Sequence, residues 1–429
     1  MNTSNQHDPY AGNILTRGLG PILSRENALA ALTYLPPVPT NIGDVPKHVR
    51  MHMAMQLRDF HCPPLEEARL QSTIDLMIRN SYRYRDPIAA STWQTISGGY
   101  SANRLPRTPA LSAAIVGHSG TGKTEATLRS LCLYPQQVIC HDEFPRIVGR
   151  HRQVVWLSVD IPASGKASDL ATSLMIAFDN AILAHDSQWS PRFSENLQRT
   201  RRDGAQMLSE WQQVALSHFL GIIHFDEVQN FFKLQTLEQR LKRKGKTDGR
   251  PELSIVEDQC LKWILTLTNT WKIPAIFSGT PDGIGALTTR LANIQSVVNG
   301  GYHVLKPFSN PADVTYLEVF LQRLGKYQYV KHPLSVSGDL ASLIVELTAG
   351  IQRLIIALWI AAHRVAFERK ADDLRLDDFR AAAHTYLSPV QPAVAALRSK
   401  EPKLMARYED LVRRDDNFWG GFWGQMTAH

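Results

Sequence analysis

A run of eight residues in the first third of the sequence constrains the fold more than any other feature. It fits the pattern G-x-x-x-x-G-K-[ST], in which a glycine-rich loop wraps the phosphates of a nucleotide in backbone N–H groups. Its residues are Gly117, His118, Ser119, Gly120, Thr121, Gly122, Lys123 and Thr124. Glycines allow backbone dihedrals that other residues avoid, and the helix after such a loop adds the positive end of its dipole. The run therefore predicts a binding site for a nucleoside triphosphate.

The last two residues of this run and its flanks support the same interpretation. Lys123 is predicted to reach the β- and γ-phosphates, and Thr124 to coordinate Mg²⁺ through its hydroxyl. Residues 110–116 have the apolar pattern of a buried strand, and residues 125–133 begin a helix. The order strand, loop, helix is the context that distinguishes a phosphate loop from a chance Gly-rich turn.

The overall composition is that of a globular protein with a moderate positive charge. With 429 residues, 44% of them hydrophobic, the chain is long enough for two or three domains. A net charge of +7 and a pI near 9.2 are compatible with nucleic-acid binding but do not establish it. The four cysteines are scattered without a C-x-x-C pair, so neither a zinc site nor a disulfide framework is predicted.

Neither export nor membrane insertion is predicted. The polar N-terminus lacks the basic and then apolar pattern of a signal peptide. The longest apolar stretch, residues 354–367, contains His363 and Arg364 and is too short to cross a bilayer, so we expect a core helix there. The sequence predicts a cytoplasmic protein without a membrane partner.

Changes in composition divide the chain into four predicted parts. Residues 1–64, rich in Pro, Asn and isolated hydrophobic residues, are predicted to form an extended or helical arm that binds a partner. Residues 65–310 alternate helices and strands, which predicts an α/β fold whose parallel sheet carries helices on both faces. Residues 311–400 have only helical patterns and are predicted to form an all-helical lid, and residues 401–429 form a C-terminal tail.

Hydrophobic periodicity predicts the individual elements. The predicted strands are residues 110–116, 154–160, 220–225, 273–277 and 302–305. The predicted helices are residues 65–80, 125–133, 169–184, 207–219, 260–270, 314–324, 340–347, 351–367 and 377–386. The long stretch between Lys123 and Asp226 predicts an inserted helix or loop.

Two acidic residues, Asp226 and Glu227, directly follow the predicted strand 220–225. Acidic residues at the carboxyl end of such a strand lie beside the phosphate loop, where ligands bind. Asp226 is predicted to hold Mg²⁺ together with Thr124, and Glu227 to polarise the water that attacks the γ-phosphate. The alternative interpretation is a pair of solvated loop carboxylates.

Polar residues on neighbouring strands are candidates for supporting roles. The strand 273–277 leads into two hydroxyls that can orient the attacking water, and we select Thr280 for this role, with Ser278 as the alternative. Either of them can instead be a hydrogen-bonded turn residue. Ser158 is expected to hydrogen-bond Glu227 and restrain it. His224 lies inside a strand and is expected to be a core or supporting residue rather than a catalyst.

Two arginines are candidates for stabilising the charge of a transferred phosphoryl group. Arg353 begins an apolar helix of the lid, from which its guanidinium can reach the γ-phosphate. Arg290 lies just beyond the strand that leads to Ser278, and a neighbouring subunit can use such an arginine in trans. For each of them the alternative is an ordinary surface charge.

In this order, the phosphate loop, the Asp-Glu strand end, the polar strand and the Gly-x-x-Arg helix resemble an AAA+ ATPase of the initiator-like branch. Within that branch the chain resembles TnsC, the ATP-dependent regulator of cut-and-paste DNA transposons, with TniB and MuB as more distant relatives. The matching segments are residues 117–124, 224–229, 277–281 and, less generic, 387–399 with its continuation 406–411. Together they cover roughly residues 65 to 412.

The resemblance implies a protein that binds ATP and Mg²⁺, hydrolyses ATP and assembles as a ring or helical filament on double-stranded DNA. It further implies a signal from a TniQ/TnsD-type target selector, recruitment of transposase subunits, and disassembly or reset on hydrolysis. DNA contacts are expected to be mainly to phosphates and to be salt-sensitive. The candidates are Lys166, Arg146, Arg150 and Arg152, with the basic run 240–246 as a further one unless it is a solvated loop.

Two other classes of protein share such a nucleotide site. An initiator or helicase loader is expected to carry a winged helix, but strand signals are few after residue 387. A signalling NTPase switch would bind ATP without any dependence on DNA. The aromatic residues within 418–423 are expected to dock on the lid or on a neighbouring subunit, or to bind the transposase.

Overall fold

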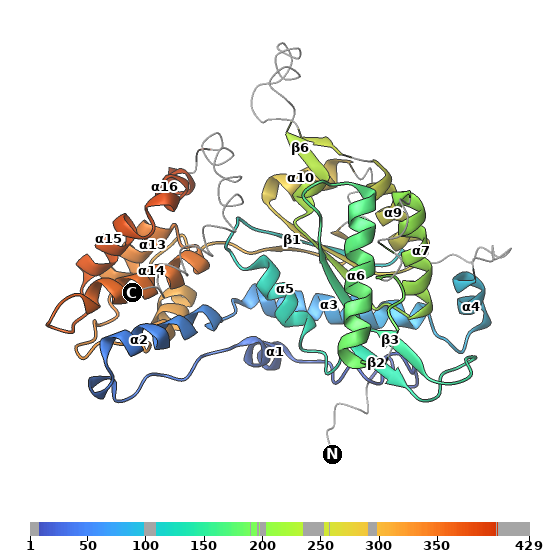
Figure 1. Ribbon diagram of the computed structural model, residues 1–429, viewed down its shortest axis with the longest axis horizontal. Helices are drawn as coiled ribbons and strands as arrows, with labels where there is room; N and C mark the ends of the chain where they lie inside the picture. The colour runs from blue at the N-terminus through green and yellow to red at the C-terminus, as the bar shows by residue number, and fades with distance from the viewer. Residues whose placement is uncertain are drawn as a thin grey trace, which may run out of the picture. The chain divides into compact units, whose positions relative to one another are not determined.

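The computed structural model describes residues 8–97, 109–188, 190–194, 197, 203–234, 253–256, 258–290, 298–399 and 401. The chain forms two compact units. The α/β unit comprises residues 1–30, 65–116 and 123–304, and the helical unit comprises residues 31–64, 117–122 and 305–429. The predicted N-terminal arm, residues 1–64, is therefore divided between the two units. Figure 1 labels the elements of both.

The α/β unit is built on a five-stranded sheet with the order β4-β5-β8-β1-β9, in which all neighbours are parallel. Its strands are β1 (Ser112–Val116), β4 (Trp156–Asp160), β5 (Ile222–Asp226), β8 (Ala275–Gly279) and β9 (Gly301–Val304). Every residue of β1, β5 and β8 is buried. Strands that are covered on both faces have mostly apolar sequences. This burial is what made the three strands recognisable in the sequence.

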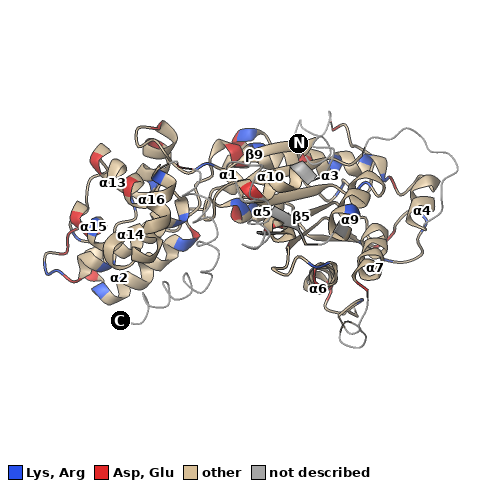
Figure 2. Ribbon diagram, turned by 90° about the horizontal axis from the view of Figure 1, so that it is seen from above, with Lys and Arg blue, Asp and Glu red and all other residues tan. Residues whose placement is uncertain are grey.

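Helices cover both faces of this sheet, which confirms the predicted fold class. The helices of the α/β unit from residue 65 onward are α3 (Leu65–Tyr84), α4 (Ala90–Ile96), α5 (Lys123–Leu131), α6 (Ala167–His185), α7 (Gly204–Ser217), α9 (Asp258–Asn269) and α10 (Pro281–Arg290). Figure 2 shows α3 on one side of the sheet and α6 with α7 on the other. Helix α3 packs against α5, and α6 packs against α7.

Two short antiparallel pairs in the α/β unit were not predicted. They are β2 (Val138–His141) with β3 (His151–Val154), and β6 (Phe232–Leu234) with β7 (Leu253–Ile255). The first pair, with α6 and α7, occupies the predicted insertion between Lys123 and Asp226. The predicted strand 154–160 began too early, because Val154 ends β3 and the apolar run continues into β4 without a break that periodicity detects.

The helical unit has a core centred on α14 (Gln352–Phe367), whose residues from Leu354 to His363 are all buried. Its other elements are α2 (Lys47–Ala54), α12 (Gln322–Leu324), α13 (Gly338–Thr348), α15 (Leu376–Thr385) and α16 (Gln391–Ser399). Part of the predicted helix 314–324 is a π-helical segment, Thr315–Leu321, that continues into α12. Helix α1 (Arg25–Leu32) lies where the chain passes from the α/β unit to the helical unit.

No single helix among the described residues is long and apolar enough to cross a membrane. Helices α13 and α14 pass such a test only as a pair bent by 113°. The apolar side chains of α14 are buried inside the helical unit, as predicted for a core helix.

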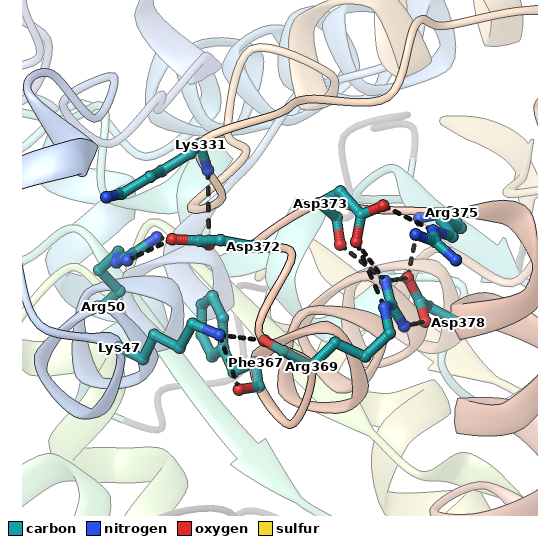
Figure 3. A network of polar contacts seen from close by, with 9 residues as sticks. All are labelled: Lys47, Arg50, Lys331, Phe367, Arg369, Asp372, Asp373, Arg375 and Asp378. Carbon is teal, nitrogen blue, oxygen red and sulfur yellow. Dashed lines mark hydrogen bonds and ion pairs between the residues drawn. The ribbon is translucent and has the colours of Figure 1, made fainter.

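Residues 31–64 pack into the helical unit through apolar and polar contacts. Met51, Ala54 and Leu57 belong to the same buried cluster as α14. The Arg50 guanidinium donates to both carboxylate oxygens of Asp372, at 2.8 and 2.7 Å, in the connection between α14 and α15 (Figure 3). An apolar stripe and a fully buried ion pair thus tie this segment to helices more than 300 residues further along the chain.

Gly350, just before α14, is a site at which a small substitution has a large predicted effect on stability. Its φ is +70°, and a Cβ added there would lie 1.9 Å from the carbonyl oxygen of Phe308. We expect Gly350→Ala to lower the free energy of unfolding of the helical unit by roughly 2 kcal/mol or more. Urea unfolding of the full chain measures this effect. Gly338→Ala is the control, since a Cβ at Gly338 meets nothing within 4 Å, and equal stability of the two variants would contradict the prediction.

Candidate nucleotide-binding site

The phosphate loop, residues 117–122, connects β1 to α5 and forms a tight turn. The N–H and the hydroxyl of Thr121 both donate to the carbonyl oxygen of His118, at 3.2 and 2.8 Å. Gly120 has a φ of +80°, a left-handed conformation that favours glycine. Lys123 is the first residue of α5 and is buried. The local backbone is therefore that of a strand, a glycine-containing turn and a helix, as the sequence predicts.

Within the helical unit, the loop lies against the first turn of α14, which carries Arg353. The N–H of Arg353 donates to the carbonyl oxygen of Gly120 at 3.4 Å. A Cβ on Gly120 would lie 3.0 Å from Cγ2 of Ile351, so the absence of a side chain allows this approach. An apolar pocket beside the contact is lined by Ile351, Leu354 and Val394, among others. The backbone of Arg353 thus lies next to the phosphate loop, and the role of its side chain at the γ-phosphate stays a prediction.

In the α/β unit, Asp226 ends β5 and joins side chains from two other elements. One carboxylate oxygen accepts a hydrogen bond from the hydroxyl of Thr124 on α5. The other accepts from the hydroxyl of Ser278 on β8 and from the N–H of Glu227, the latter at 2.8 Å. The structure therefore brings together Thr124 and Asp226, the two residues predicted to hold Mg²⁺.

The surroundings of Asp226 favour its ionised form. Burial raises the pKa of this carboxyl, but its neighbours more than offset burial. The nearby His224, the two hydroxyls and the Glu227 N–H lower the pKa, and the net value lies below that of an ordinary aspartate. A carboxylate beside a threonine hydroxyl, both held by regular elements, offers the oxygen ligands that Mg²⁺ prefers. The residues present fit this ion.

Glu227 follows Asp226 in a left-handed backbone conformation, with φ +56°. Its carboxylate accepts a hydrogen bond from the side-chain amide of Gln229. The amide oxygen of Gln229 in turn accepts from the backbone N–H of Thr280 at 3.1 Å. Gln229 thereby fixes the predicted general base relative to the end of β8.

The two hydroxyls at the end of β8 have different surroundings. The hydroxyl of Thr280 accepts a hydrogen bond from the N–H of Gly283 at 3.3 Å, at the start of α10. Ser278 is fully buried and donates to Asp226. The structure therefore places Ser278, the alternative candidate, in direct contact with the acidic motif, and gives Thr280 a capping contact.

Two contacts that support the acidic residues were not predicted from the sequence. Gln229 lies in the quoted segment 224–229, but its spacing alone did not show that its amide meets Glu227. His224 was expected in a core or supporting position, and its two ring nitrogens lie 2.8 Å from the hydroxyl of Ser158 and 2.7 Å from that of Ser278. A polar residue inside an otherwise apolar strand was the only signal.

The arginines and lysines proposed for other roles differ in their surroundings. Arg290 is the last residue of α10, but its side chain lies outside what the structure describes. Lys166 is exposed immediately before α6. Arg146 is exposed and donates from Nε to the carbonyl oxygen of Ile88 at 3.0 Å.

The remaining DNA candidates are engaged in ion pairs. Arg150 pairs with Asp142 at 3.2 Å, and both side chains are exposed. The guanidinium of Arg152 binds the carboxylate of Asp186 and is largely buried. Lys166, Arg146 and Arg150 are thus the candidates with accessible side chains. The basic run 240–246 and the aromatic residues of 418–423 lie outside the described residues.

Comparison with known proteins finds a similarity over the segment that holds this site. Residues 107–286 match the model of a family described as AAA domain. This segment contains the phosphate loop, Asp226, Glu227, Ser278 and Thr280, together with strands β1, β4, β5 and β8 of the sheet. Over this segment the chain is similar to that family. No curated protein sequence matches the chain.

Several solved structures are similar to the chain at low sequence identity. The Aeropyrum pernix ORC1 protein in complex with DNA is 14% identical, with a TM-score of 0.39 over 80% of this chain and 81% of that one. The Aeropyrum pernix ORC2 protein in its ADPNP–ADP complexes is 13% identical, with a TM-score of 0.36 over 64% and 62% of the two chains. A mutant of Thermotoga maritima RuvB is 12% identical, with a TM-score of 0.32 over 72% and 69%.

Proposed function

We propose that this protein binds ATP with Mg²⁺ at the phosphate loop and hydrolyses it to ADP and phosphate. The observation that carries the proposal is the contact of Asp226 with Thr124, the last residue of a complete G-x-x-x-x-G-K-T run. A Mg²⁺ ion bound with the nucleotide would neutralise charge on the phosphates. Lys123 would bind the β- and γ-phosphate oxygens, and the loop N–H groups would bind the remaining ones.

In this proposal the protein's own residues position and deprotonate the attacking water. Glu227 accepts the proton of the water, and Gln229 sets where its carboxylate lies. Ser278 orients Asp226, while Thr280 remains a candidate for contacting the water. Arg353, beside the phosphate loop, and Arg290, from a neighbouring subunit, would stabilise the charge that develops on the transferred group.

We further propose that ATP binding drives assembly on DNA and that the protein regulates transposition. The support is the sequence resemblance to TnsC, in particular the segment 387–399 at the end of the helical lid. The protein would form a ring or filament on double-stranded DNA, respond to a TniQ/TnsD-type selector and recruit the transposase. Hydrolysis would disassemble or reset it. The exposed Lys166, Arg146 and Arg150 would contact DNA phosphates without reading sequence.

Electron microscopy of the full chain with a non-hydrolysable ATP analogue tests the assembly. We expect rings or filaments with duplex DNA and nucleotide together, and neither when DNA or nucleotide is omitted. Because phosphate contacts release counterions, DNA affinity should fall at least tenfold between about 50 and 200 mM salt for several contacts.

Two outcomes of the same experiment would favour the other classes. Nucleotide binding without any DNA-dependent assembly would overturn the transposition proposal and favour a signalling switch. Closed rings that load onto DNA without forming a recruitment platform for transposase would favour an initiator or helicase loader. A pull-down of purified transposase by the DNA-bound assembly distinguishes this second outcome.

A further inference from the structure

A buried chain of hydrogen bonds crosses three neighbouring strands of the sheet and ends at Asp226. Ser158 on β4 lies opposite His224 on β5, and its hydroxyl is 2.8 Å from Nδ1 of the imidazole. On the other side of the ring, Nε2 is 2.7 Å from the hydroxyl of Ser278 on β8. The hydroxyl of Ser278 also contacts Asp226. His224 and Ser278 are fully buried, so protein groups define their hydrogen bonds.

The chemistry of these groups fixes the direction of each hydrogen bond. An ionised carboxylate only accepts, so the hydroxyl of Ser278 must donate its single proton to Asp226. Its oxygen then accepts from His224, which requires a proton on Nε2. A neutral imidazole carries one proton, so Nδ1 is bare and accepts from the hydroxyl of Ser158. The ring is fully buried, and both of its nitrogens face neutral hydroxyls.

The opposite tautomer of His224, with the proton on Nδ1, would leave a buried acceptor without a donor. If Nδ1 carried the proton, Nε2 would be a lone pair facing the hydroxyl of Ser278. The single proton of Ser278 could then satisfy His224 or Asp226, but not both, and one buried acceptor would be left without a donor. The Nε2–H tautomer satisfies all the contacts at once.

We propose that His224 is a positioning residue of the nucleotide site, whose Nε2–H makes Ser278 a fixed donor to Asp226 and so orients the carboxylate toward Thr124. This inference rests on the proposed ATPase function and deepens it. One oxygen of Asp226 is occupied by Ser278 and by the Glu227 N–H, which leaves the other directed at Thr124. Groups that orient metal ligands in this way commonly change metal affinity or activity about 10- to 100-fold when they are removed.

Two amide substitutions at His224 distinguish the loss of the Nε2–H donor from the loss of side-chain volume. The side-chain nitrogen of glutamine takes approximately the place of Nε2, whereas that of asparagine takes the place of Nδ1. We expect His224→Asn to lower kcat about tenfold or more and to raise the Mg²⁺ concentration for half-maximal hydrolysis. His224→Gln should restore most of both quantities. Binding of a fluorescent ADP without Mg²⁺ should be unchanged in both variants, because the loop holds the phosphates.

His363 provides a matched control for replacing a buried histidine. It is fully buried in α14, where Nδ1 lies 2.8 Å from the carbonyl oxygen of Trp359. His363→Asn and His363→Gln should not reproduce the split between kcat and nucleotide affinity. In addition, His224→Asn and Ser278→Ala are expected to be non-additive, because both remove the same donor to Asp226. Equal activity of wild type and His224→Asn would overturn the inference.

A spectroscopic measurement tests the arrangement without relying on activity. Nitrogen-15 NMR of the ring of His224 in the nucleotide-free full chain should show the neutral Nε2–H tautomer. An Nδ1–H tautomer would overturn the inference even if the ATPase proposal holds. Conversely, a wild-type protein without ATPase activity but with the Nε2–H tautomer would refute the proposed function and leave the hydrogen-bond chain intact.

Discussion

Replacing Glu227 with glutamine is expected to slow ATP hydrolysis about 100-fold or more, because an amide does not accept the proton of the attacking water. Nucleotide affinity should remain close to that of wild type, since the phosphate loop and Lys123 are untouched. The substitution keeps the size of the side chain, and its amide oxygen can still accept from Gln229. Steady-state phosphate release with Mg²⁺ and ATP, together with titration of a fluorescent nucleotide, separates the two effects.

The matched control for this variant is Glu346→Gln. Glu346 is half exposed on α13 and lies 3.7 Å from Arg398, so the same chemical change occurs away from the nucleotide site. Its turnover should equal that of wild type. Unchanged turnover in Glu227→Gln would refute the assignment of the general base, whereas loss of nucleotide binding would mean that Glu227 supports the fold of the site.

The sequence predicted those features of the site that depend on neighbours in the chain. The phosphate loop is one continuous run, and the Asp-Glu pair stands at the end of β5. The central strands β1, β5 and β8 were found because strands buried on both faces are mostly apolar. These features depend on residues that are close together in the chain, so a single sequence is sufficient to predict them.

Contacts between strands that are distant in sequence could not be predicted from patterns of neighbouring residues. Ser158, His224 and Ser278 meet because β4, β5 and β8 are neighbours in the sheet, although the three strands are far apart in the sequence. The sequence did not distinguish the surroundings of Ser278 from those of Thr280 for a related reason. The two residues have the same parity along the strand, so alternation does not separate them, and only the end of β8 at Gly279 does.

The N-terminal segment shows the same limit on a larger scale. Proline-rich composition indicated an extended arm, yet residues 31–64 belong to the helical unit. The composition of α2 gave little sign of its partners, because its buried residues include Arg50 as well as Met51 and Ala54. A buried arginine requires an opposite charge to compensate for its desolvation, and for Arg50 that charge is the carboxylate of Asp372.

Breaking the Arg50–Asp372 pair is expected to have the largest effect on stability. Both side chains are less than 10% exposed, and Arg50 also donates to the carbonyl oxygens of Val45 and Tyr329, at 2.8 and 2.9 Å. Asp372→Asn would leave a buried guanidinium without its counter-charge, at a cost of about 3–5 kcal/mol. Asparagine tolerates the left-handed backbone of Asp372, φ +53°, so this variant tests charge rather than strain.

The dependence on pH follows from the direction of the pKa shift. Burial raises the pKa of Asp372, but the hydrogen bonds and charge of Arg50 outweigh burial and bring it below the ordinary value. A carboxyl with a lowered folded-state pKa stabilises the protein above its unfolded pKa, and this contribution is lost as the pH falls through the folded value. The difference between wild type and Asp372→Asn should therefore be full at neutral pH and shrink in acid.

Hydrogen exchange of α2 in the full chain measures this effect locally, without assuming that both units unfold together. The control is Arg380→Met, which removes an exposed pair with Asp377 and should cost at most about 1 kcal/mol. The double variant Arg50→Met with Asp372→Asn should lose less than the sum of the single variants, because neither charge is then left buried alone. Wild-type protection of α2 in Asp372→Asn at neutral pH would show that the apolar contacts of Met51, Ala54 and Leu57 hold the segment without the ion pair.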